Sequence, residues 1–281
     1  MSKKNSQNKV KSVIYVMMAF FMSCLFMLLS VSVTLQITLL NPNFILDNMN
    51  STNYFVEKRQ EIEQSLVDLG YASGLEEEFF ENLLNPVDMY DDTELYFKEY
   101  YTGKSTVIDT TRFKQDFNSA LDKYIEDNNI NIVSTGSRDY LVKKAAGIYS
   151  SSLEIPLFAR MSTYILALKN IMPMMIIVFS GLIIVLTLIV IFTNSWKHRA
   201  LKYICYATSG ATLTVGIIPA VVFISGKIRQ INISSRSLYG LFVQCADNIF
   251  IILAFCSVIL LITSVGLFFI HNNMRKKLLN D

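Results

Sequence analysis

Four long apolar stretches dominate the pattern of hydrophobic and polar positions along the chain. They cover residues 13–40, 171–193, 203–225 and 249–270, and none of them contains Asp, Glu, Lys, Arg or His. A helix needs about 20 apolar residues to cross the hydrocarbon core of a bilayer, because each residue advances about 1.5 Å. Lipid offers the backbone no hydrogen-bond partner, so these stretches predict transmembrane helices rather than open strands.

The first two stretches are separated by a mostly polar segment, residues 41–170, whose apolar residues recur at helical spacing. One stripe, for example, repeats every four residues: Phe113, Phe117, Leu121 and Ile125. Such a stripe is typical of an amphipathic helix that buries one face. The sequence therefore predicts an all-α membrane protein, with four transmembrane helices and a helical extracytoplasmic domain inserted between the first and the second.

Within this domain, turn residues divide the helical pattern. The spacing predicts a helix from about Phe55 to Gly70, a second over residues 73–84, and a third from Val87 to Gly103. Residues 128–136 are expected to form a loop or a short strand, because Ile130, Ile132 and Val133 nearly alternate with polar residues. Helices are expected again over 139–150 and from Pro156 to Asn170, since proline suits the first turn of a helix.

Basic residues near the ends of the apolar stretches predict the orientation in the membrane. They gather in residues 1–12, 194–202 and 271–281: Lys3, Lys4, Lys9, Lys11, Lys197, Arg199, Lys202, Arg275, Lys276 and Lys277. Lys227, Arg229 and Arg236, in the outer loop 226–248, oppose this bias without reversing it. By the positive-inside rule, we expect a multi-pass plasma-membrane protein with both termini in the cytoplasm.

The first apolar stretch has two alternative interpretations. It follows a lysine-rich head, as a cleaved signal peptide would, and Cys24 is placed like a lipoprotein acceptor. The run is too long for a signal peptide, however, and it continues through Leu40 without an A-x-A-like site. We therefore expect an uncleaved signal anchor.

Small residues and prolines mark the candidate structural positions within the spans. Small side chains share one face of the third span and are expected to let helices pack closely: Ala207, Gly210, Ala211 and Thr214. A polar pore lining is the alternative interpretation of this span. Pro173 and Pro219 can each bend a span, so both are hinge candidates, although a plain change of direction would also explain Pro173.

Composition argues against several functions. The segment 41–170 carries about 21 acidic and about 12 basic residues, a net charge near −9, which disfavours nucleic-acid binding. The four cysteines and two histidines all lie in or beside the spans: Cys24, Cys205, Cys245, Cys256, His198 and His271. No catalytic motif or cofactor motif occurs, so we predict no enzymatic activity and no cofactor. The acidic runs 76–78 and 91–92 could attract a hard cation, but a solvated surface is the preferred interpretation and no metal site is predicted.

Several short segments resemble a family of small four-span membrane proteins of unknown function from low-GC Gram-positive bacteria. They are LNPNF at 40–44, NYF at 53–55 leading to SGLEE at 73–77, YYTG at 100–103 leading to ID at 108–109, the basic turn 196–203 and the loop 231–239. The resemblance implies a plasma-membrane protein of a single-membrane bacterium. It implies no activity.

The order of one span, a large outer domain and three further spans is also similar to permease subunits of ABC systems related to cell division. Those subunits need a cytoplasmic coupling helix for an ATPase, and here only residues 194–202 are available. We therefore expect a non-enzymatic protein whose acidic outer domain binds another membrane or envelope protein, in an accessory or sensing role. The alternatives are a transport component, such as an ABC-type permease subunit or a self-associating pore, and then an enzyme acting on envelope lipids. Self-association into a homo-oligomer is compatible with the first two.

Overall fold

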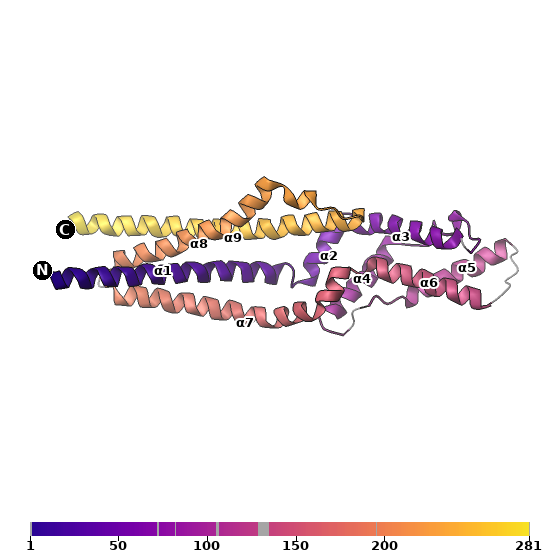
Figure 1. Cartoon of the computed structure of the whole chain (residues 1–281), viewed down its shortest axis with the longest axis horizontal. Helices are drawn as coiled ribbons and strands as arrows, with labels where there is room; N and C mark the ends of the chain where they lie inside the picture. Colours follow the sequence, from indigo (N-terminus) through magenta and orange to yellow (C-terminus); the bar gives the residue numbers. More distant parts are fainter. Residues whose placement is uncertain are drawn as a thin grey trace. The chain divides into compact units, whose positions relative to one another are not determined.

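The computed structural model describes residues 2–71, 73–81, 83–104, 107–128, 135–194 and 196–280, and the regular secondary structure of this part is helical, without strands (Figure 1). Its elements are α1 (Ser2–Ile37), α2 (Pro42–Ser51), α3 (Tyr54–Tyr71), the 3-10 turn η1 (Glu77–Phe79), α4 (Pro86–Tyr100), α5 (Thr111–Asp127), α6 (Thr135–Leu153), α7 (Pro156–Thr193), α8 (Lys197–Ser225), the 3-10 turn η2 (Lys227–Gln230) and α9 (Arg236–Asn280). The all-α prediction is thereby confirmed.

Four of these helices are long and apolar enough to cross a membrane. The apolar parts are Lys11–Ile37, Met161–Thr193, Lys197–Ser225 and Arg236–Lys276. Their number agrees with the sequence prediction. The chain divides into two compact units, which we call the apolar unit (residues 1–40, 169–231 and 245–281) and the helical domain (residues 41–168 and 232–244).

In the apolar unit, α1 packs closely along α8. Where the two helices meet, small side chains are fully buried, including Ala19 on α1 and Ala200 and Ala207 on α8. Large apolar side chains such as Ile177 and Phe192 on α7 instead point away from the protein, with exposed fractions of 72% and 82%. That arrangement suits helices surrounded by lipid, because lipid solvates large apolar side chains and leaves close packing to small ones.

The helical domain has an aromatic core. α3 packs against α4 and α6, and α5 packs against α6. The largest fully buried side chains are mostly aromatic: Tyr54, Tyr96, Tyr100, Phe80, Phe97 and Phe117. Burying each of them removes a large apolar area from water, which stabilises the domain.

Two asparagine–proline pairs begin helices in this domain. The Asn41 and Asn85 side chains accept hydrogen bonds from the backbone N–H of Asn43 at 3.1 Å and of Val87 at 3.0 Å. The proline that follows each asparagine takes the first helical position, where its missing N–H is not needed. These caps fix where α2 and α4 start.

Several predicted helix boundaries were wrong. Residues 73–84 do not form a full helix: Gly74 has a left-handed φ of +78°, and only the three-residue turn η1 follows. Phe80 instead enters the core below Gly70. α6 begins at Thr135, earlier than predicted, and the loop or strand expected around Ile130 lies outside the described residues.

The second and fourth spans belong to longer helices than the sequence predicts. α7 runs without a break from Pro156 through Pro173 to Thr193, although a separate helix was expected to end at Asn170. α9 begins at Arg236, inside the segment expected to be an outer loop, and continues to Asn280. Hydrophobicity marks only the apolar middle of each helix, so it places the ends of long helices poorly.

Candidate functional site

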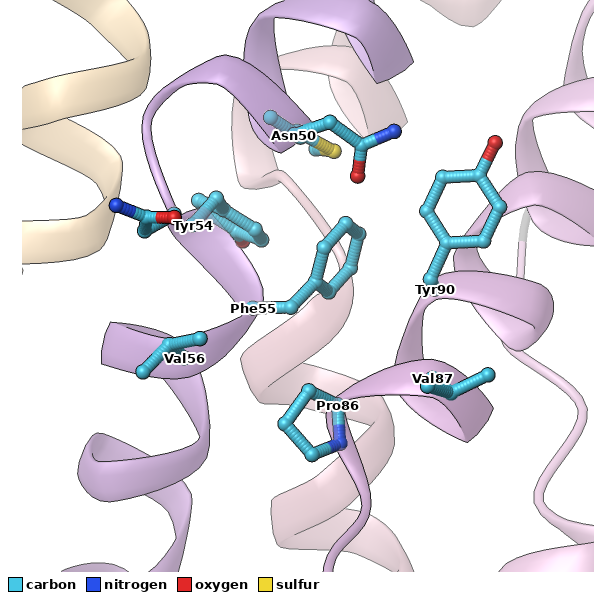
Figure 2. A pocket seen from close by; sticks show the side chains of 9 residues that line it. Asn50, Tyr54, Phe55, Val56, Pro86, Val87 and Tyr90 are labelled. Atoms are coloured by element: carbon cyan, nitrogen blue, oxygen red, sulfur yellow. The ribbon is translucent and has the colours of Figure 1, made fainter.

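An apolar groove of about 310 Å³ lies in the helical domain, beside the α2–α3 turn and the start of α4 (Figure 2). It is lined by Met49, Asn50, Asn53, Tyr54, Phe55, Val56, Pro86, Val87 and Tyr90. The rings of Phe55 and Tyr90 meet edge to face, with their centroids 5.6 Å apart. This geometry is favourable for aromatic pairs and gives the groove a rigid wall.

Two aliphatic residues of the groove are exposed although they belong to a domain with an aromatic core. Val56 on α3 is 51% exposed and Val87 on α4 is 63% exposed, whereas Phe55 between them is buried. Exposed apolar side chains that gather around a concave surface are typical of binding sites. The groove therefore has the form of a site for an apolar side chain of a ligand or partner.

Tyr54 lies at the base of this region and is completely buried. Its hydroxyl has no hydrogen-bond partner among the described residues. Burial raises the pKa of Tyr54, and the nearby carboxylate of Glu61 raises it further, so the phenol stays protonated.

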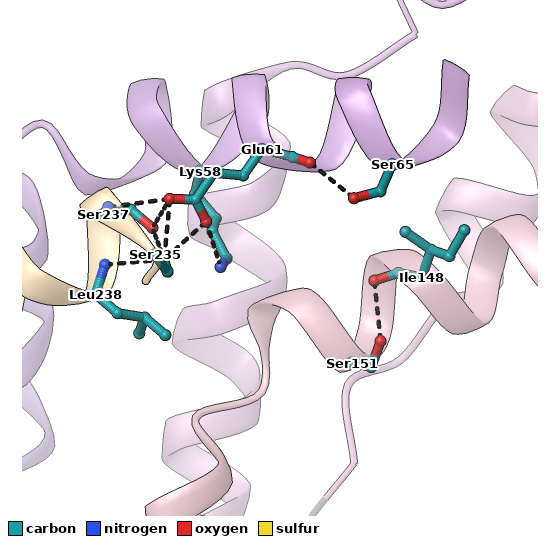
Figure 3. A network of polar contacts seen from close by, with 8 residues as sticks. All are labelled: Lys58, Glu61, Ser65, Ile148, Ser151, Ser235, Ser237 and Leu238. Carbon is teal, nitrogen blue, oxygen red and sulfur yellow. Dashed lines mark hydrogen bonds and ion pairs between the residues drawn. The ribbon is translucent and has the colours of Figure 1, made fainter. Parts of the chain in front are cut away.

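A polar cluster is built around the Glu61 carboxylate (Figure 3). Glu61 on α3 accepts hydrogen bonds from the Ser235 hydroxyl at 2.8 Å and from the Ser237 backbone N–H at 3.1 Å. The Ser237 hydroxyl also donates to it, at 3.0 Å. The ammonium group of Lys58, which is only 5% exposed, lies 2.8 Å from the same carboxylate. We call Lys58, Glu61, Ser235 and Ser237 the carboxylate lock.

The carboxylate lock fastens the first turn of α9 to α3. The Ser235 hydroxyl also accepts a hydrogen bond from the backbone N–H of Leu238 at 3.3 Å, as a helix cap does. One turn before Glu61 on α3, Glu57 pairs with Arg236 at 3.1 Å. A carboxylate at the start of α9 is further stabilised by the positive end of the helix dipole. From this attachment α9 continues to Asn280, and it is one of the four helices long and apolar enough to span a membrane.

The lock holds Glu61 in its charged form. Partial burial raises its pKa, but hydrogen bonds from Lys58, from the Ser237 backbone and from Ser235 outweigh that effect and lower the pKa to about 2. The carboxylate therefore stays ionised at any pH near neutrality. The lock itself is not a switch near neutral pH.

A second polar cluster, formed by Arg112, Asp88, Asp92 and Tyr149, joins α4, α5 and α6. Arg112 pairs with Asp88 and Asp92, each at 2.8 Å, and the Tyr149 hydroxyl donates to Asp92 at 2.7 Å. Burial raises the pKa of Asp92 despite the hydrogen bond from Tyr149 and the charge of Arg112. The Phe113 ring stacks on Tyr149 at 4.5 Å. The acidic run at 91–92 thus takes part in an ion pair between helices, and the described residues contain no group of His, Cys, Asp and Glu that could hold a metal ion.

The helix-packing candidates of the third span lie partly at the α1–α8 contact. Ala207 and Ala211 are fully buried, and a Cβ on Gly210 would lie 2.8 Å from the Ser23 hydroxyl oxygen of α1. Thr214 does not join this contact: it is exposed, and its hydroxyl donates to the Gly210 and Ala211 carbonyl groups. Polar groups in this region are therefore used in packing and in bonds within the helix.

The two proline hinge candidates occupy different surroundings. Pro173 is exposed on α7 and Pro219 is buried on α8, and both helices continue past them. Elsewhere in the apolar unit, hydroxyl groups join α8 to α9: the Ser257 hydroxyl donates to the Thr212 carbonyl at 3.0 Å, and the Ser209 and Ser264 hydroxyls lie 2.6 Å apart. Such bonds specify how helices associate in lipid.

With this geometry in view, the comparisons with known proteins add no further constraint. Neither a family model, nor a curated protein, nor a solved structure matches this chain.

Proposed function

We propose that this chain is a non-enzymatic, multi-pass protein of the plasma membrane whose helical domain lies outside the cell and binds another membrane or envelope protein. The four apolar helices support insertion in a bilayer. The basic residues in 1–12, 194–202 and 271–281 support an orientation with both termini in the cytoplasm. The domain then faces the envelope, where an accessory or sensing role is open to it.

The groove beside Phe55 is the single observation that carries partner binding. Its exposed valines and its aromatic wall fit an apolar or aromatic side chain of a partner. The acidic surplus of residues 41–170 favours a partner segment that carries basic residues beside that anchor, because opposite charges speed association and select the partner.

A sensing role is supported by the position of the groove on α3. Val56 lines the groove, and its neighbour Glu57 pairs with Arg236 at the start of α9. One turn further along α3, Glu61 forms the carboxylate lock with the same end of α9. A partner that shifts the start of α3 therefore alters the attachment of a helix that continues into a candidate span.

In-cell crosslinking followed by affinity isolation of the full-length protein tests this function. Val87→Lys places a charge in the groove, and Leu95→Lys is the matched control, because Leu95 is also an exposed aliphatic residue of α4, at 48%, but does not line the groove. We expect one stoichiometric partner with the wild type and with Leu95→Lys, and its loss with Val87→Lys.

Two other outcomes would reject the proposal. If all three forms recover only copies of this chain, as an oligomer of fixed size, the protein associates with itself and the pore alternative is favoured. If the partner is an ATPase that stays bound in Val87→Lys, the permease alternative is favoured.

A further inference from the structure

A polar cavity of about 350 Å³ lies in the apolar unit, where the start of α1, the end of α7 and the start of α8 come together. Three cationic side chains line it, one from α1 and two from α8: Lys11, Arg199 and Lys202. It lies beyond the apolar middle of these helices, at the depth where lipid headgroups meet the ends of transmembrane helices. None of its residues takes part in the groove or in the carboxylate lock.

The cations of this cavity have no acidic partner in the described part of the chain, where neither Lys11, Arg199 nor Lys202 pairs with a carboxylate. The acid that the structure describes in the apolar unit, Asp247, pairs with Arg229 at 3.5 Å. His271 of α9 contacts the His198 carbonyl at the start of α8, beside the cavity. Asp247 lies about 36 Å from His271 along α9, at 1.5 Å per residue, and is therefore far from the cations of the cavity. The positive charge of the cavity is therefore left for an external anion.

Aromatic and hydroxyl groups give the cavity fixed walls. The Tyr15 hydroxyl donates to the Thr193 carbonyl at 3.1 Å, and the Ser12 and Tyr203 hydroxyls lie 3.1 Å apart. The Tyr15 and Tyr203 rings are in contact, with centroids 5.2 Å apart. These bonds join all three helices around the opening, at which the exposed cations Lys11, Arg199 and Lys202 lie.

The start of α8 lies beside the same cavity. Trp196, which lines the cavity, is the residue before the first turn, and its side chain makes no capping hydrogen bond. The first N–H groups of a helix have no partner within the helix, and together with the helix dipole they favour an anion. Cationic side chains such as those of Lys11, Arg199 and Lys202 form strong, charge-assisted hydrogen bonds with phosphate.

We infer that this cavity binds a phosphate group, supplied by the headgroup of an anionic membrane lipid. A free phosphate compound offers the same chemistry, but the position of the cavity at the ends of three long apolar helices favours a lipid, whose acyl chains would lie against their exposed apolar faces. Basic cavities between transmembrane helices are known to select anionic headgroups in this way. The inference is independent of the partner-binding function.

The fluorescence of Trp196 reports on this cavity directly, because Trp196 is the chain's single tryptophan and lines it. The purified full-length protein in a neutral detergent is titrated with short-chain phosphatidylglycerol, with short-chain phosphatidylcholine and with inorganic phosphate. We expect a saturable change with phosphatidylglycerol at a concentration at least tenfold lower than with phosphatidylcholine. A response to inorganic phosphate as strong as that to phosphatidylglycerol would assign the site to a soluble phosphate compound.

Charge-removing variants then test which cations form the site. Each cation near an anionic headgroup contributes about fivefold, so Arg199→Gln with Lys202→Gln should weaken the binding of phosphatidylglycerol about 25-fold. The matched control, Arg275→Gln with Lys276→Gln, removes two charges outside the cavity and should change binding less than threefold. Arg199→Lys keeps the charge and the fold, and should bind nearly as well as the wild type.

Two further results would overturn the inference. One is equal binding of phosphatidylglycerol and phosphatidylcholine by the wild type. The other is equal loss of binding in the cavity variant and in the control, which would mean that net charge alone attracts the lipid.

Discussion

The two units of this chain are stabilised by different kinds of contact. In the apolar unit, α1 and α8 meet through alanines, Gly210 and a few larger side chains such as Met22, while many large apolar side chains face outward. In the helical domain, large aromatic side chains fill the interior and ion pairs join the helices. The contrast is what two different solvents would select.

The physical reason lies in the driving force for burial. In water, removing an aromatic ring from solvent is strongly favourable, so the domain buries its rings. In lipid, no such force acts between apolar helices, and close approach of backbones and hydrogen bonds between helices must serve instead. The substitutions below are expected to have different effects in the two units for that reason.

The largest effect is expected from truncating a core ring of the domain. Phe97 is fully buried and contacts Phe158 edge to face at 5.6 Å, so Phe97→Ala should destabilise the domain by about 3–5 kcal/mol. The same change at Phe192, which is 82% exposed on α7, should change the free energy of unfolding of the protein by less than about 0.5 kcal/mol. Limited proteolysis of both variants in detergent measures this, and equal protection would contradict the comparison.

A smaller effect is expected from opening the carboxylate lock. Glu61→Gln removes the charge that compensates the buried Lys58 and weakens the bonds to Ser235 and Ser237, at a cost of about 2 kcal/mol after allowing for partial exposure. Amide hydrogen exchange at the start of α9 should become about 30-fold faster. Glu94→Gln, which breaks an exposed pair with Lys98, is the control and should cost less than about 0.5 kcal/mol.

The pH dependence of the lock has a definite sign. The pKa of Glu61 is about 2 in the folded protein, below its ordinary value of 4.5, so the lock contributes its full stability above about pH 5. That contribution should be lost as the pH falls from about 4.5 towards 2. Exchange at the start of α9 that accelerates already between pH 7 and pH 5, in the wild type but not in Glu61→Gln, would disprove this assignment.

An intermediate to small effect is expected from enlarging the glycine at the α1–α8 contact. Because a Cβ on Gly210 would lie 2.8 Å from the Ser23 oxygen, Gly210→Leu should push the helices apart at a cost of about 1–2 kcal/mol. A Cβ on Gly181 would meet nothing within 4 Å, so Gly181→Leu on α7 should be nearly neutral. The two melting temperatures in detergent separate these outcomes, and equal shifts would argue against close packing at Gly210.

The smallest effect is expected at the second polar cluster, which contains Asp92 and Tyr149. Tyr149→Phe keeps the stacking on Phe113 but removes the hydrogen bond to Asp92, which should cost about 1 kcal/mol. The pKa of Asp92, already raised by burial, should rise further, since that hydrogen bond lowers it. Tyr140→Phe, at a ring that is 60% exposed, is the control, and thermal unfolding of both should differ by a few degrees.

Much of the fold follows from periodicity alone. Four uncharged apolar stretches predict four long helices, and the stripe of Phe113, Phe117 and Leu121 predicts the buried face of α5. The third helix of the domain, predicted from Val87, begins within one residue of α4. These features depend on residues near one another in the sequence, which is why the sequence reveals them.

The groove and the lock could not be predicted in this way. Glu61 and Ser237 are 176 residues apart, and no local pattern shows that they meet. The serines before α9 could have indicated a helix start. The span was instead predicted from the uncharged stretch 249–270, so its start was placed too late and Arg236 was assigned to a loop. Residues 73–84 mislead for a related reason: Phe80 has helical spacing, yet it is buried by a turn after Gly74.

One measurement tests partner binding through the groove most directly. A photoreactive amino acid is placed in living cells at Val87, in the groove, or at Tyr140, which is equally exposed but lies outside it. We predict a crosslinked product of a single added mass from position 87, absent from position 140 and lost when Val56→Lys is combined with it. The same products from both positions, or a product from position 87 that contains only this chain, would contradict the proposal.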